Sequence, residues 1–204
     1  MADLEFRRWT EPPRTILEDL CGCHDDMLFV ADVTEKLLVQ YDQDQPDHTL
    51  VDALSVAAIV RYCRSFVQGY RFRLDPGTQA ELNEDELVLH NRIRQTRDKH
   101  IAHPINLQET YTLTIGFAAE GPSAFAPQAI GVQGRQIAAV DAADADRLNA
   151  LAHRWLEWIQ AAMNEEQLRL MPTAMQLTPD QVQSLPQPPD SPSQDPGTRR
   201  RQPR

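Results

Sequence analysis

Hydrophobic residues return every three or four positions in four segments of the chain, at residues 15–41, 50–68, 79–102 and 144–169. This spacing places the apolar side chains of each segment on one face of a helix, and that face is expected to be buried. Four such helices joined by polar loops predict a mainly α protein. We expect an up-and-down four-helix bundle in which the apolar faces share one core.

Polar residues at the segment boundaries indicate where two of these helices begin. Thr15 is followed three residues later by a glutamate, which is the pattern of a capping box that satisfies the first free amides of a helix. The third helix has two possible starts, because Thr78 and Asn83 are each followed by a glutamate at the same distance. Gly69 suits the end of the second helix, where a left-handed residue is often needed.

The hydrophobic period changes from helical to alternating after Pro104. Residues 110–117 alternate threonine or glycine with large apolar side chains, which predicts a half-buried β-strand. Ile130 and Val132 suggest a second strand, and residues 137–140 a short third one. We therefore expect an antiparallel hairpin or meander at about residues 108–140, inserted before the last helix and acting either as a lid or as a cover for one end of the bundle.

Composition indicates one folded domain and a tail. With 204 residues, of which 41% are hydrophobic and 25% charged, the chain can bury a substantial core. We assign residues 1–171 to this domain. Residues 172–204 are rich in Pro, Gln and Ser and poor in large apolar side chains, which is typical of a disordered tail.

The chain shows no targeting or metal-binding pattern. It has no run of about 18 apolar residues, so we expect neither a signal peptide nor a membrane span, and a cytoplasmic location. Its three cysteines, Cys21, Cys23 and Cys63, should remain reduced. Cys23 and His24 are potential zinc ligands, but Cys23 lies on an apolar helical stripe and no second ligand pair accompanies it. We expect neither a metal nor another cofactor.

The charge of the chain limits how it can bind nucleic acid. Its formal net charge is −10, which argues against broad binding to phosphates and leaves only local contacts. Much of the positive charge falls into two groups of arginines: Arg61, Arg64, Arg71 and Arg73, and then Arg92, Arg94 and Arg97. These groups form either a basic pocket between packed helices or a set of ion pairs with the abundant carboxylates.

Arg97 is the first candidate for a functional residue. The helical repeat places it on the inner stripe of the third helix, where a charge is costly unless it is paired or used. It is expected either to form a salt bridge to one of the first two helices, through Asp25, Asp26 or Asp52, or to serve a site.

His103 follows at the end of the same helix. Pro104 disfavours helical backbone in the residue before it, so His103 can fold back toward Arg97. Arginine offers a permanent charge and a planar fork of donors to phosphate, and histidine exchanges protons near neutral pH. Arg94 with His100 and Arg147 with His153 repeat the same separation. Arg147 belongs to a plain helical repeat, so its partner His153 is expected on a solvated face.

Arg97-Asp98 followed by Ala102-His103, late in a long helix, resembles the Arg-polar-x(3-5)-His signature of the HEPN superfamily. The abortive-infection (AbiU-like) branch is the nearest likeness. The resemblance covers roughly residues 15 to 170, with specificity only in the eight-residue motif. It implies a helical bundle, often dimeric, that is either a metal-independent endoribonuclease or a catalytically silent nucleotide-binding relative.

Two functions are compatible with these residues. In a ribonuclease, His103 would move protons and Arg97 would hold the charge that develops on the phosphoryl oxygens, supported by Asp98, His100 and Arg94. In a silent module, the same residues would hold a nucleotide phosphate or an acidic group of a partner without turnover, as in a regulatory or antitoxin-like component. The expected partners are RNA or a nucleotide phosphate and an antitoxin or another protein. For the ribonuclease we expect a homodimer that brings two copies of the motif to one cleft. Trp155 and Trp158 follow the helical repeat and are expected in the core or at an interface rather than as base-stacking platforms.

Overall fold

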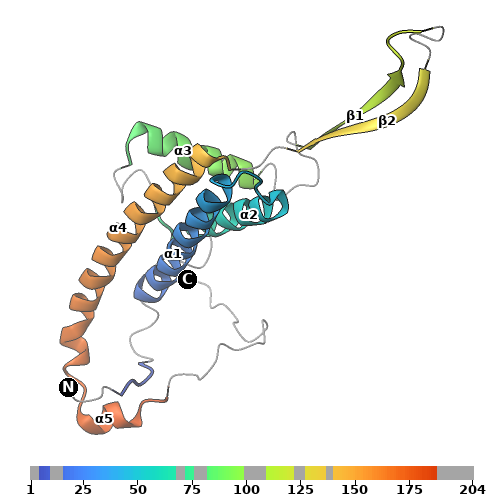
Figure 1. Ribbon diagram of the computed structural model, residues 1–204. Helices are drawn as coiled ribbons and strands as arrows, with labels where there is room; N and C mark the ends of the chain where they lie inside the picture. The colour runs from blue at the N-terminus through green and yellow to red at the C-terminus, as the bar shows by residue number, and fades with distance from the viewer. Residues whose placement is uncertain are drawn as a thin grey trace.

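The computed structural model describes residues 5–9, 16–67, 72–75, 82–98, 109–121, 127–136 and 140–187 (Figure 1). Its elements, in chain order, are α1 (Ile16–Tyr41), α2 (His48–Arg64), α3 (Glu84–Thr96), β1 (Glu109–Phe117), β2 (Pro127–Gln136), α4 (Ala142–Ala174) and α5 (Pro179–Ser184). The predicted mainly α architecture, with an antiparallel hairpin before the last long helix, is confirmed.

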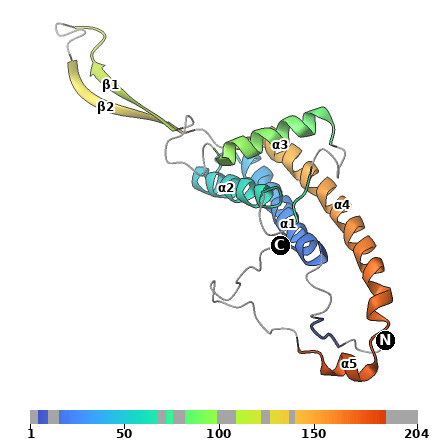
Figure 2. The same ribbon diagram turned by 180° about the vertical axis from the view of Figure 1, so that it is seen from behind.

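Helix α1 is the centre of the bundle. It packs against α2 on one side and α4 on the other, and α3 lies across the pair formed by α2 and α4 (Figures 1 and 2). Most of the fully buried side chains come from α1, α2, α3 and α4, and the largest of these include Leu20, Met27, Leu37, Tyr62, Leu148 and Trp155. The apolar stripes expected from the sequence therefore do meet in one core.

Aromatic rings fill the space where α2, α3 and α4 meet. Trp155 of α4 is fully buried, and its ring centroid lies 5.2 Å from that of Phe66, in a tilted, nearly edge-on arrangement. Phe66 also stands edge-on to His90 of α3, at 4.6 Å. The prediction that Trp155 is a core residue is confirmed. Trp158 lies one turn further along α4 and is only partly buried, and its ring centroid is 6.2 Å from that of Trp155.

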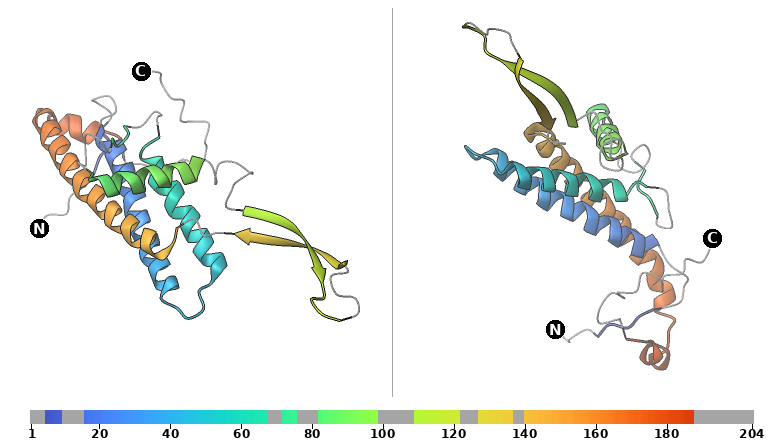
Figure 3. Two further views of the ribbon diagram at one scale, coloured as in Figure 1. Left: turned by 90° about the horizontal axis from the view of Figure 1, so that it is seen from above. Right: turned by 90° about the vertical axis from the view of Figure 1, so that its right-hand side faces the viewer.

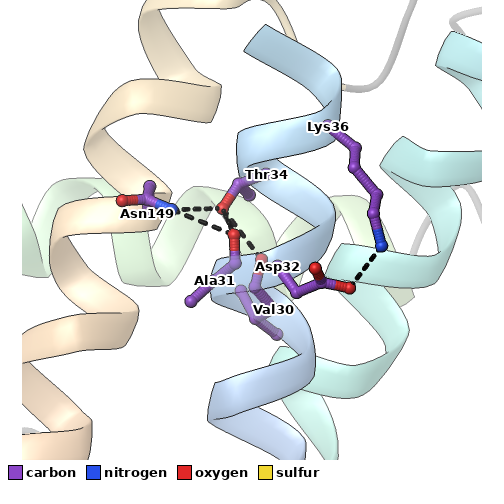
Figure 4. A network of polar contacts seen from close by, with 6 residues as sticks. All are labelled: Val30, Ala31, Asp32, Thr34, Lys36 and Asn149. Atoms are coloured by element: carbon purple, nitrogen blue, oxygen red, sulfur yellow. Dashed lines mark hydrogen bonds and ion pairs between the residues drawn. The ribbon is translucent and has the colours of Figure 1, made fainter. Parts of the chain in front are cut away.

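A buried polar contact fixes α4 on α1. Figure 4 shows Asn149 of α4 donating hydrogen bonds of 3.0 Å from Nδ2 to both the Ala31 carbonyl and Thr34 Oγ1. Thr34 Oγ1 is itself within 2.9 Å of the Ala31 carbonyl and 2.8 Å of the Val30 carbonyl, which share its proton. Because polar groups are costly to bury unless they are paired, this contact favours one register of the two helices.

Helix α3 uses the later of its two predicted starts. Asn83 accepts a hydrogen bond from the Glu86 amide at 3.0 Å, and the Glu86 side chain accepts one from the Asn83 amide at 2.8 Å. This reciprocal capping box begins the helix at Glu84. The α-helix ends at Thr96, and residues 97 and 98 continue it as a wider turn. Thr78 and Ala102, the earlier start and the predicted end, lie outside the described residues.

The hairpin pairs Leu113 with Val132 and Ile115 with Ile130, in antiparallel register. Its large apolar side chains are nevertheless exposed, so the prediction of half-buried strands was wrong. The reason is visible in Figures 1 and 3: the hairpin projects away from the helices, and its alternating pattern meets no core. The proposed third strand, apart from Val140, falls outside the described residues.

The chain beyond residue 171 is helical for longer than its composition suggests. Helix α4 continues through Pro172 to Ala174, and the Met175 amide still donates to the Met171 carbonyl at 2.9 Å. A capping box of Thr178 and Gln181 then starts α5. The prediction of a tail without structure from residue 172 was therefore wrong up to residue 187. Residues 188–204 lie outside the described part of the chain. Among the described helices, none has the length and apolar character that a bilayer crossing requires.

Candidate functional site

The carboxyl end of α3 carries Arg94, Arg97 and Asp98. Arg97 Nη1 donates to Asp98 Oδ1 at 2.7 Å, in a pair whose side chains are 38% and 56% exposed. The helical repeat predicted an inward-facing Arg97, but the wider turn that begins there leaves it at the edge of the core. An exposed pair of neighbouring residues holds an arginine only weakly.

The expected alternative, a salt bridge from Arg97 to α1 or α2, is not found among the described residues. Asp26, the one buried carboxylate among the three candidates, is already occupied: it accepts from Arg61 at 2.6 Å and lies 3.5 Å from Arg64. The Arg61 guanidinium also lies over the Phe29 ring, 4.6 Å from its centroid. Both arginines are on α2, so this cluster joins α2 to α1.

Other arginines also join helices. Arg154 of α4 donates to both carboxylate oxygens of Glu86 on α3 at 2.8 Å, and Arg92 of α3 forms an ion pair with Asp144 of α4. The hypothesis of a common basic pocket is therefore wrong for Arg61, Arg64 and Arg92, which form ion pairs between helices. Arg71 lies outside the described residues.

Arg94 differs from these bridging arginines. It is exposed on α3, one turn before Asp98, and within the described part of the chain no carboxylate is paired with it. Arg94 and Arg97 are thus the two arginines of the motif helix whose charges, among the described residues, do not hold two helices together.

The buried thiol of Cys63 lies beside this end of α3, with Sγ 3.9 Å from the Ile93 carbonyl. Burial raises the pKa of Cys63 to about 12; Asp98 adds to the rise, and Arg97 and Arg94 oppose it. The thiol is therefore protonated at neutral pH and is a poor nucleophile. Its contribution here is packing.

The remaining motif residues fall outside the described part of the chain. His100 and His103 are among residues 99–108, so their distance from Arg97 stays a prediction. One pair of equal spacing is described: Arg147 and His153 of α4 are both exposed, and for His153 this is what the sequence predicted. Cys23 is a core residue, also as predicted, and the described residues contain no group of three side chains suited to a metal ion.

His90 is a buried titratable residue that the sequence reasoning missed. Its Nδ1 lies 2.9 Å from the Tyr62 hydroxyl, and its Nε2 is buried with no hydrogen-bond partner among the described residues. Burial, and then the charge of Arg94, lower the pKa of His90 to about 4. The histidine is neutral at pH 7 and belongs to the core. Its position three residues before Ile93 on the apolar stripe was the available signal.

We expect acid to destabilise the protein through His90. The unfolded histidine binds its proton near pH 6.5 and the folded one only near pH 4, so the unfolded state gains protons first as the pH falls. Stability attributable to His90 should be complete above about pH 6.5 and fall by up to about 3 kcal/mol toward pH 4. Urea unfolding across this range measures it. A His90→Gln variant should show a flatter profile, and an equally steep one would assign the effect to other groups.

No family model, curated protein or solved structure matches the chain. The HEPN resemblance consequently rests on the motif at the end of α3.

Proposed function

We propose that this protein is a metal-independent endoribonuclease of the HEPN type, with Arg97 and His103 as its catalytic residues. One observation carries the proposal most strongly: within the described part of the chain Arg97 is paired only with its exposed neighbour Asp98, at the edge of the core, although Arg61, Arg92 and Arg154 all form ion pairs between helices. An arginine that stabilises no helix contact is available for a phosphate.

The proposed reaction is a transesterification of RNA. The 2′-hydroxyl oxygen attacks the adjacent phosphorus, the bond to the 5′-oxygen breaks, and a 2′,3′-cyclic phosphate forms. His103 moves the protons between these two oxygens, and Arg97 stabilises the charge on the phosphoryl oxygens. Arg97 can exchange Asp98 for phosphate at little cost, because the pair is exposed. Arg94 would add a second positive charge near the phosphate, and His100 would be a second histidine that supports the site.

The acidic chain has few cations near this site. A homodimer that presents Arg94 and Arg97 from both subunits in one cleft would concentrate positive charge on a single RNA strand.

Through its resemblance, the motif suggests a role in phage defence or in a toxin and antitoxin pair.

Cleavage of a labelled single-stranded RNA tests the activity directly. We expect cleavage in the presence of excess chelator and product ends that carry a cyclic phosphate, because the proposed chemistry uses only side chains. The reaction should slow markedly with added salt, since few arginines provide the attraction. Cleavage that requires added magnesium or zinc would contradict the proposal.

A second candidate is a silent module that binds a nucleotide or a protein partner. It is favoured by the exposed apolar face of the hairpin, which is unusual for a surface that only faces water. The RNA experiment separates the two functions. A silent nucleotide-binding module would retain RNA or nucleotide on a filter without producing cleaved ends, and a module that binds only a protein partner would neither retain nor cleave RNA.

A further inference from the structure

One face of the hairpin carries large apolar side chains that are exposed in the described part of the chain. Leu113, Ile115 and Phe117 of β1 are 72%, 58% and 52% exposed, and Ile130 and Val132 of β2 are 77% and 65% exposed. The register places Leu113 opposite Val132 and Ile115 opposite Ile130, so these side chains share one face. We call this set of five residues the apolar face.

An isolated hairpin with such a face needs a partner. Two-stranded sheets are only marginally stable in water unless they pack against another layer. Here the hairpin projects from the bundle in every view, so α1 to α4 do not supply that layer (Figures 1, 2 and 3). The opposite face offers mainly threonine and glycine, including Thr114 and Gly116, and has no need of cover.

We propose that the apolar face is a homodimer interface, in which the hairpins of two copies pack face to face. The residues of this face carry no charge, so the face is complementary to itself, as a two-fold contact requires. Pairing edge to edge into a four-stranded sheet would leave the apolar side chains in water. Stacking the two faces, about 10 Å apart, covers them.

The area of the face suits a dimer of moderate affinity. Taking roughly 200 Å² for a fully exposed large apolar residue, the five side chains offer on the order of 600 Å² per copy. Two copies would bury about 1,200 Å², the lower end of the range for specific interfaces.

The charge of the chain also bears on the occupant of the apolar face. Each chain carries a net charge of −10, and the uncharged apolar face is a surface on which two copies can meet without placing like charges in the contact. The same acidity disfavours an anionic membrane as the occupant.

Sedimentation of the full chain over a concentration series tests the proposal. We expect a reversible dimer with a Kd of roughly micromolar order. The double substitution Ile115→Glu and Ile130→Glu, a cross-strand pair, should raise the Kd at least about a hundredfold, because it places like charges in the contact. Thr114→Glu is the control: it adds one of the same carboxylates to the opposite face of β1 and should leave the dimer intact.

A second measurement guards against loss of the hairpin itself in the double variant. Amide hydrogen exchange in β1 and β2 of the unmodified protein should slow as the concentration rises through the Kd. A protein that stays monomeric, a dimer that survives the double substitution, or exchange independent of concentration would overturn the proposal. Binding of the monomer to phosphatidylcholine and phosphatidylglycerol vesicles, lost in the double variant, would assign the face to lipid instead. These outcomes do not depend on RNA cleavage, so this inference and the ribonuclease proposal can fail separately.

Discussion

Replacing Arg97 or His103 by alanine should remove RNA cleavage while leaving the protein folded. The loss of a general acid and base costs about 10²–10⁴ in rate, and the loss of one group that stabilises transition-state charge about 10²–10³. Arg97→Ala should not unfold the bundle, because its partner Asp98 is exposed and lies next to it in the chain. Initial rates on a labelled RNA, with circular dichroism of each variant, measure both effects.

The chain contains a matched control for this experiment. Arg147 and His153 have the same separation in sequence, but they lie exposed on α4. Arg147→Ala and His153→Ala should therefore cleave RNA at the rate of the unmodified protein. Equal losses of cleavage rate at both pairs would indicate that the substitutions act through the overall charge of the protein. Full activity of Arg97→Ala would refute the assigned site.

Trp155→Ala should cause a large loss of stability. Trp155 is fully buried and contacts the rings of Phe66 and Trp158. Truncating a buried tryptophan costs about 3–5 kcal/mol, because it removes apolar contacts and leaves a cavity. Domains of this kind are stable by about 5–15 kcal/mol, so the variant should unfold at clearly lower urea concentration.

Trp158→Ala provides the comparison for that result. Trp158 is only partly buried, and the stability that burial contributes scales with area, so we expect roughly half the loss or less. Urea denaturation of both variants in parallel gives the two free energies. Similar losses would mean that Trp158 contributes more to the core than its exposure indicates.

The sequence alone determined the elements that depend on short-range physics. The apolar repeats of α1, α2, α3 and α4 predicted helices that bury one face, because 3.6-residue periodicity is a property of the local chain. The capping box of Asn83 and Glu86 was one of two starts that the sequence allowed for α3, because a capping box depends only on residues within one turn, and the structure shows that this box is formed. The alternation around Leu113 predicted a strand for the same reason.

The prediction of a tail without structure from residue 172 was wrong because it rested on composition and did not consider the local capping pattern. Residues beyond Pro172 lack large apolar side chains in number, and that suggested a tail without structure. Proline removes only one amide from the helix, however, and α4 continues past it to Ala174. Thr178 and Gln181 then cap α5, a signal that was present in the sequence and was overlooked.

Only the tertiary structure decided which charged side chains form ion pairs between helices and which apolar faces are buried. Asp26 lies 35 residues from Arg61 along the chain, yet it forms ion pairs with both Arg61 and Arg64. Among the described residues, Arg97 therefore has no buried carboxylate as a partner. Alternation in β1 says that one face is apolar, but whether a core covers that face depends on where the hairpin points. Periodicity reports the local repeat, whereas ion pairing and burial depend on which distant segments meet. For that reason the sequence predicted the helices and strands, and the fold determined which arginines join helices and which apolar face is exposed in the described part of the chain.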